Sequence, residues 1–158
     1  MRILKTFIPT LVLSLGLMNI ATSCSDNNDE PEIPAAKSVV GTYASDITCT
    51  VLGQELTFEN ITYTITATDD TTISLNISSF GNPPMQIPAF TIYGIKVTGS
   101  DGKYEFSETD FNGTTDDGKA YSGTIQGNVI NNTLSAQFNI VFGAMPMPMI
   151  CSFTAPKK

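Results

Sequence analysis

From Val39 onward, apolar side chains alternate with threonine, serine and asparagine, and this pattern predicts β-strands throughout. Glycine and pairs of aspartate or asparagine separate the alternating runs, and no segment has the spacing of an amphipathic helix. The part of the chain that folds is therefore expected to be all-β. Eight strands are expected, near residues 39–52, 55–68, 73–77, 89–98, 104–106, 121–129, 134–142 and 149–153.

The alternation changes parity within two of these strands. In the second strand the apolar residues change sides between Phe58 and Ile61, which predicts a β-bulge near Glu59 and Asn60. In the fourth strand the change occurs around Gly94, which predicts a sharp bend in a curved sheet.

Eight consecutive strands with short connections and one apolar face each predict an up-and-down antiparallel barrel. A β-sandwich has the same alternation and is the alternative fold. Either the inward side chains leave a void for a ligand, or their rings fill the interior. Six aromatic residues are the candidates for this interior: Tyr43, Phe58, Tyr63, Phe106, Tyr121 and Phe138.

The connections between strands fall into two kinds, which would lie at opposite ends of a barrel. The second, fourth and sixth are short and polar, as hairpin turns are. The third and seventh share the pattern Phe-Gly-x-x-Pro-Met, at residues 80–85 and 142–147. These two connections would lie together at one end of the barrel, which we call the mouth. The mouth would be either an adaptable apolar rim for a ligand or partner, or a plug that closes the barrel. Its candidate residues are Phe80, Met85, Ile87, Phe142, Met145, Met147 and Met149.

Residues 1–23 combine a basic start, an apolar run and small residues, which is the pattern of a secretory signal peptide. The segment that ends in Cys24 resembles a bacterial lipoprotein signal, in which the cysteine becomes the acylated first residue; an ordinary secreted protein is the alternative. Residues 24–38 are acidic and contain prolines, so we expect a disordered tether there. The barrel domain would then span residues 39–158.

The stretch SDNNDE that follows Cys24 resembles the acidic export signal of some Gram-negative lipoproteins. A solvated linker has the same composition and is the alternative. We expect the lipid on Cys24 to hold the protein at the outer membrane, on the cell surface. The periplasmic side of the same membrane is the alternative location.

Three motifs carry a resemblance to a family: VVGTYASDI in the first strand, YSGTIQGNVI in the sixth and MICSFTA in the last. Together with the lipoprotein signal, they resemble the calycin-like β-barrel lipoproteins, which are small lipocalin-related barrels, over residues 39–155. The resemblance implies the barrel fold. Where lipocalins open with Gly-x-Trp, this chain has Gly41, Thr42 and Tyr43, and it contains no tryptophan.

The composition argues against several classes of function. The chain has 15 Asp and Glu against 8 Lys and Arg, a net charge of −7, which is unsuited to nucleic acid or to a bare anionic membrane. It contains no histidine, the commonest general base and zinc ligand. The carboxylates of residues 107–120 lack the alternating spacing of a calcium loop. We therefore expect neither catalysis nor a cofactor or metal site.

Cys49 and Cys151 lie on the apolar parity of the first and last strands, which are neighbours in a closed barrel. A cross-strand disulfide and two buried thiols are both compatible with this placement.

Two functional hypotheses follow. The first is a lipid-anchored binding module that captures a small apolar ligand or a partner at the mouth. The second is a non-catalytic interaction lipoprotein that has a packed core and works within an envelope assembly. The sequence leaves the ligand, the partner and the oligomeric state open.

Overall fold

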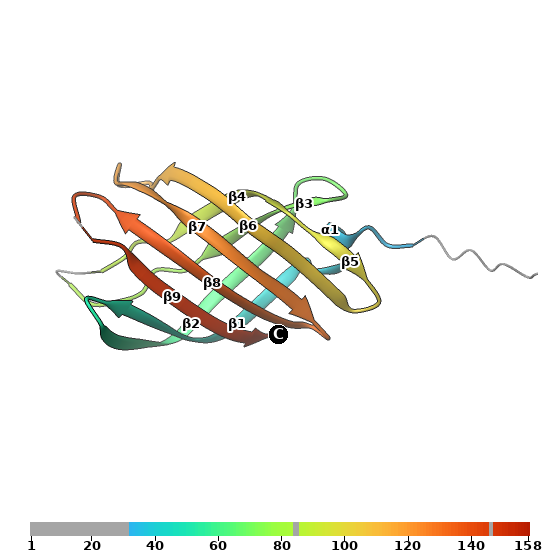
Figure 1. The fold of residues 1–158 in the computed structure, drawn as a ribbon, viewed down its shortest axis with the longest axis horizontal. Helices are drawn as coiled ribbons and strands as arrows, with labels where there is room; N and C mark the ends of the chain where they lie inside the picture. Colours follow the sequence, from blue (N-terminus) through green and yellow to red (C-terminus); the bar gives the residue numbers. More distant parts are fainter. Residues whose placement is uncertain (1–31, 84–85, 146) are drawn as a thin grey trace, which may run out of the picture. The chain divides into compact units, whose positions relative to one another are not determined.

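The computed structural model describes residues 32–83, 86–145 and 147–158, which form a nine-stranded sheet rolled into a nearly closed barrel (Figure 1). A short helix, α1 (Ala35–Ser38), precedes the first strand, and the described part of the chain has no helix long and apolar enough to cross a membrane. The strands are β1 (Gly41–Val51), β2 (Gln54–Ala67), β3 (Thr72–Ile77), β4 (Phe90–Lys96), β5 (Thr98–Ser100), β6 (Lys103–Thr114), β7 (Ala120–Ile130), β8 (Thr133–Phe142) and β9 (Met149–Pro156).

The strand order is β4-β3-β2-β1-β9-β8-β7-β6-β5, and each hydrogen-bonded pair is antiparallel. The predicted antiparallel barrel is therefore confirmed against the sandwich alternative. The strand count is nine rather than eight, because the predicted fourth strand is divided at Val97. The N–H of Val97 donates to the carbonyl of Thr71 at 2.8 Å, and its side chain is buried.

The barrel closes at the segment that contains β4 and β5. The hydrogen-bonded sheet has β4 at one end and β5 at the other, and only Val97 separates these two strands. The described residues form no ladder between β4 and β6, and the hydroxyl of Tyr121, in β7, donates across this seam to the carbonyl of Thr91, in β4, at 2.7 Å. The rings of Phe90 and Phe111 lie 5.3 and 6.3 Å from that of Tyr121. Side chains therefore close this seam in place of backbone pairing.

Both predicted irregularities are confirmed. The pairing of β1 with β2 shifts by one residue opposite Asp46, and Asn60 has a φ of 61° there. The backbone N–H of Asn60 donates to the Asp46 carboxylate at 3.0 Å, which satisfies a group that the bulge removes from the ladder. In β4, Gly94 has a φ of 76° at a second register shift. Glycine adopts this left-handed conformation without a steric penalty.

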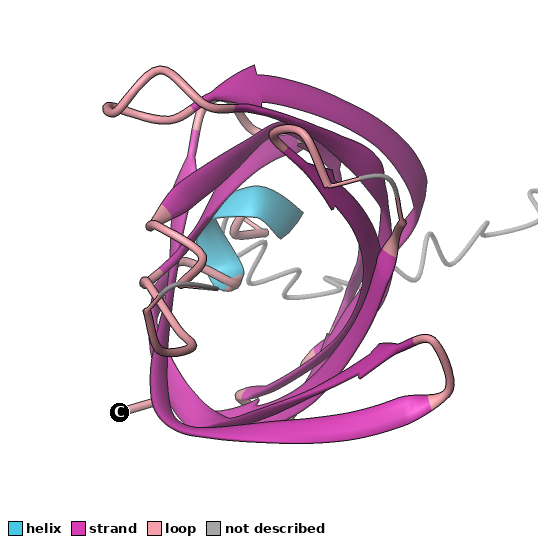
Figure 2. Cartoon of the chain, turned by 90° about the vertical axis from the view of Figure 1, so that its left-hand side faces the viewer, coloured by secondary structure: helices cyan, strands magenta, loops and turns pink. Residues whose placement is uncertain are grey.

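Helix α1 closes the end of the barrel opposite the predicted mouth, and Figure 2 shows it within the ring of strands. Its four residues belong to the predicted tether but are folded instead. Ala36 and Val39 are fully buried, and the N–H of Ala36 donates to the carbonyl of Asp70 at 3.2 Å. The hydroxyl of Tyr43 donates to the carbonyl of Val39 at 2.6 Å, which fixes the turn from α1 into β1.

Two glycines of β7 allow the neighbouring strands and aromatic rings to approach closely. Gly123 pairs with Phe111, and Gly127 pairs with Phe106. A Cβ atom on either glycine would overlap a backbone carbonyl of β8 and the ring of its phenylalanine partner. Each ring thus covers its glycine from the inside, where any larger residue would push the strands apart.

Candidate functional site

The predicted interior residues lie inside the barrel. Tyr43, Tyr63 and Phe138 are at most 1% exposed, so protein atoms enclose these side chains almost completely. Phe106 and Tyr121 are also buried, while Phe58 is half-buried and packs against the core.

Aromatic rings run through the interior in a continuous series. Successive ring centroids are between 3.7 and 6.5 Å apart, so each ring is in direct contact with the next. The series passes from the mouth inward through Phe142, Tyr121, Phe90, Phe138, Phe153 and Tyr63. Rings from different walls therefore meet in the middle of the barrel and occupy the volume that a carrier would keep for its ligand.

Most of the predicted mouth residues turn inward. Four of them are buried, each at most 7% exposed: Phe80, Ile87, Phe142 and Met149. Phe80 and Ile87 also exchange two backbone hydrogen bonds, of 3.0 and 2.8 Å, which hold the β3–β4 connection against the barrel. Met145 is half-buried against the core and Met147 is 40% exposed, while Met85 lies outside the described residues. At this end the arrangement is that of a plug.

A hollow of about 520 Å³ lies beside the plug, between the β3–β4 and β6–β7 connections. It is lined by Ser79, Pro83, Gln86, Pro88, Ala89, Asp116, Asp117 and Lys119. The hydroxyl of Thr115 donates to the Asp117 carboxylate, which also pairs with the Lys119 ammonium at 3.0 Å. The Thr115 hydrogen bond lowers the pKa of Asp117. Asp117 thus serves the turn itself, and the described residues contain no group of three or more acidic or cysteine side chains placed to hold a metal ion.

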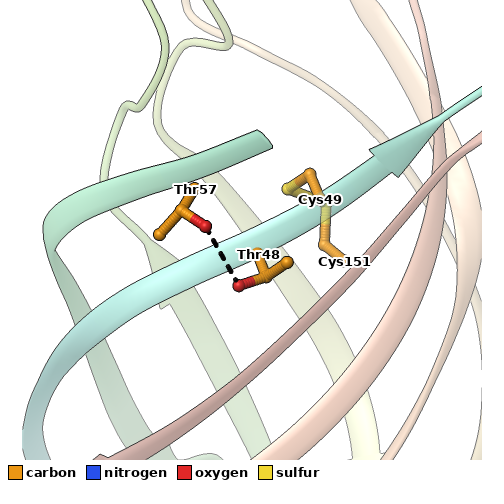
Figure 3. Close-up of a disulfide and its surroundings, with 4 residues drawn as sticks. All are labelled: Thr48, Cys49, Thr57 and Cys151. Carbon is orange, nitrogen blue, oxygen red and sulfur yellow. Dashed lines mark hydrogen bonds between the residues drawn. A yellow bond between two sulfur atoms is a disulfide. The ribbon is translucent and has the colours of Figure 1, made fainter. Parts of the chain in front are cut away.

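Cys49 and Cys151 are joined by a disulfide, shown with the neighbouring Thr48 and Thr57 in Figure 3. The two cysteines are directly opposite in the pairing of β1 with β9, with Cα atoms 4.1 Å apart, and both are fully buried. The bond links the first strand to the last. Cys24, the predicted lipidation site, lies outside the described residues.

The outer face of β7, β8 and β9 was not among the predicted sites, although the sequence carries a signal for it. From Ala120 to Pro156 the chain has no charged residue, whereas 15% of the whole chain is charged. The alternation of apolar and polar residues identifies the inward positions, but it does not distinguish charged from uncharged polar residues at the outward positions. This uncharged face is therefore visible only when the outward positions are read together.

Comparison with known proteins agrees with this architecture. The sequence matches the family model of the calycin-like beta-barrel domain over residues 39–155, while no curated protein matches it significantly. Among solved structures, the fold is similar to that of a candidate outer membrane protein from Bacteroides fragilis, with a TM-score of 0.69 and 24% sequence identity. That similarity covers 80% of this chain and 53% of the other, so the chain spans about half of that protein. The resemblance predicted from the sequence is thus confirmed, and the chain belongs to the calycin-like β-barrel domain family.

Proposed function

We propose that this protein is a non-catalytic binding module of the cell envelope, in which the barrel is a filled scaffold and the outer surface binds. The observation that carries the proposal is the packed interior. The aromatic series occupies the barrel, α1 covers one end, and the inward-turned side chains of the β3–β4 and β8–β9 connections cover the other.

Two observations support the envelope as the location. Residues 1–23 have the pattern of an export signal, and Cys24 follows small residues as a lipid-bearing cysteine does. The structurally similar Bacteroides fragilis protein is named as a candidate outer membrane protein. A lipid on Cys24 would hold the module at the membrane and leave the barrel wall free to contact a partner.

A second candidate function is the capture of a small apolar ligand at the mouth. Met147, which is 40% exposed, and the half-buried Met145 are the observations that favour it. Methionine side chains adapt to irregular apolar surfaces. On this alternative the ligand would displace the plug rather than enter an existing void.

Native mass spectrometry separates the two functions. Residues 25–158 would be purified from the periplasm of a bacterial host, and the intact mass compared before and after denaturation. A filled barrel gives the polypeptide mass alone and shows no saturable binding of 1-anilinonaphthalene-8-sulfonate, a fluorophore whose aromatic rings bind to apolar sites.

A co-purifying molecule that is lost on denaturation would contradict the proposal, as would saturable binding of the fluorophore. A Met145→Ala, Met147→Ala variant then tests the alternative, because weakened fluorophore binding in it would assign the site to the mouth. Thr64→Ala, in β2, is the matched control.

A further inference from the structure

A groove of about 730 Å³ crosses the outside of the barrel on the wall formed by β6, β7, β8 and β9, at the front of Figure 1. Two rows of outward side chains form its sides. Direct pairing makes the first row continuous from β6 to β9 and the second from β7 to β9, because β6 and β7 shift register between Phe106 and Thr109. One row is Glu105, Asn128, Ser135 and Thr154, and the other is Ser107, Gln126, Gln137 and Ser152.

The floor of the groove is backbone. It is the row Phe106, Gly127, Ala136 and Phe153, whose side chains lie on the inner face. Because Gly127 has no Cβ, the sheet can approach the Phe106 ring closely at this point. The floor of the groove on the outside and the glycine–phenylalanine contact on the inside are therefore at the same place in the sheet.

The sides of the groove carry side-chain groups that are available for hydrogen bonds with a ligand. Among the described residues, the side-chain amides of Gln126, Asn128 and Gln137 make no hydrogen bond to another protein group, whereas the hydroxyls of Ser135 and Thr154 lie 3.1 Å apart and bond each other. An amide presents two donors and one acceptor with two lone pairs. Each glutamine can therefore both donate to and accept from the hydroxyl groups of a ligand.

The chemistry of the sides limits the class of ligand. Among the described residues that line the groove, Lys96 and Glu105 are the charged ones and stand at one end, so this lining contains no cation cluster for a phosphate or carboxylate. Its two rows carry no apolar or aromatic side chain on which a lipid chain could rest. Amides and hydroxyls along the part of the groove on β7, β8 and β9, where the sequence has no charged residue, match a neutral ligand that is rich in hydroxyl groups.

The groove is also elongated. It runs across four adjacent strands, and the usual spacing between strands makes this a span of roughly 14 Å. A single sugar would fill only part of that length. The shape suits several linked units lying across the strands.

We propose that this groove binds a neutral oligosaccharide chain, with Gln126 and Gln137 as the central hydrogen-bonding pair. The inference rests on the proposed function, because it names the ligand class and the wall through which the filled barrel binds. The two glutamines are directly paired between β7 and β8, and both are exposed.

Affinity electrophoresis tests the inference with defined probes. Residues 25–158 would be run in native gels that contain amylopectin, dextran, laminarin, galactomannan or arabinoxylan, with acidic polygalacturonate as a further gel. At least one neutral polysaccharide is expected to retard the protein, and polygalacturonate is not. In a titration with that polysaccharide, Gln126→Ala with Gln137→Ala should raise the dissociation constant about tenfold or more, as the loss of two hydrogen-bonding groups predicts.

Asn76→Ala with Thr91→Ala is the matched control, because these residues form a hydrogen-bonded polar pair on β3 and β4, outside the groove. It should bind as the unaltered protein does. Failure of all five neutral polysaccharides to retard the protein overturns the inference, as does unchanged binding in the double glutamine variant. Concentration-dependent dimerisation that the glutamine variant abolishes, without polysaccharide binding, would instead assign the wall to a second copy. None of these results depends on whether the barrel is filled, which mass spectrometry decides separately.

Discussion

Two tyrosines inside the barrel show how much a single buried hydroxyl depends on its partner. Tyr43 and Tyr63 are directly paired between β1 and β2, and both are fully buried. The Tyr43 hydroxyl donates to the carbonyl of Val39, whereas the Tyr63 hydroxyl has no hydrogen-bond partner among the residues that the structure describes. The nearby Ser45 hydroxyl donates to the carbonyl of Asp46 instead. A buried polar group without a partner loses its hydration and gains nothing in return.

Removing these two hydroxyls should therefore change stability in opposite directions. Tyr43→Phe leaves the Val39 carbonyl without its donor and is expected to lower the free energy of unfolding by about 2 kcal/mol. Tyr63→Phe removes an unsatisfied group and should raise it by about 1 kcal/mol. Urea denaturation of both variants measures the two changes. Destabilisation of similar size in both would contradict the difference between the hydroxyls.

At the scale of the elements, the sequence predicted those features that local alternation determines. The bulge in β2 follows from the change of parity between Phe58 and Ile61, and the bend in β4 follows from Gly94. Both depend on which side of a strand a residue faces, and apolar spacing records this directly.

Features that depend on distant contacts were not predictable in the same way. The division of the fourth strand at Val97 and the helix at Ala35–Ser38 are each accompanied by hydrogen bonds to the β2–β3 turn. That turn comes near them only once the barrel has formed. The inward orientation of Phe80 and Ile87 likewise depends on their mutual pairing, which the shared Phe-Gly-x-x-Pro-Met pattern does not reveal.

The disulfide joins the first strand of the chain, β1, to the last, β9, and its loss should be costly. It closes a loop with a sequence separation of 102, for which restriction of the unfolded chain contributes about 5 kcal/mol. Cys49→Ala with Cys151→Ala should lower the free energy of unfolding by about that amount. Denaturation of the oxidised protein and the variant gives the difference, and reduction should add about 2 Da to the intact mass. A protein whose unfolding midpoint is the same with and without reductant would not contain this bond.

Across the whole molecule, burial of phenols makes stability depend on alkaline pH. Burial raises the pKa of Tyr43, Tyr63 and Tyr121, while tyrosines in the unfolded chain ionise near pH 10, as an approximate reference. Below about pH 10 both states keep these protons, so the stability is fully present. As the pH rises further, the unfolded chain releases protons that the native state retains, and the free energy of unfolding falls by about 1.4 kcal/mol per pH unit for each such tyrosine.

Urea denaturation between about pH 9 and about pH 11 tests this dependence. The fall in stability should be shallower in Tyr63→Phe than in the unaltered protein. Tyr93→Phe is the matched control, because that phenol is 66% exposed, and it should follow the unaltered protein. Equally steep curves for Tyr63→Phe and the unaltered protein would contradict a buried, neutral Tyr63.

The last residues of the chain return to the first strand. The N–H of Lys158 donates to the carbonyl of Thr42 at 2.8 Å, and Lys157 is paired with Tyr43. Since β9 pairs with β1 within the sheet, the first and last strands of the chain are neighbours, and neither lies at an edge of the sheet. A circular permutant, joined by a flexible linker between the residues before β1 and those after β9 and reopened between Asn131 and Asn132 in the β7–β8 turn, would keep every strand pairing intact. The strand pairings of this barrel therefore do not require the chain to begin at β1 and end at β9.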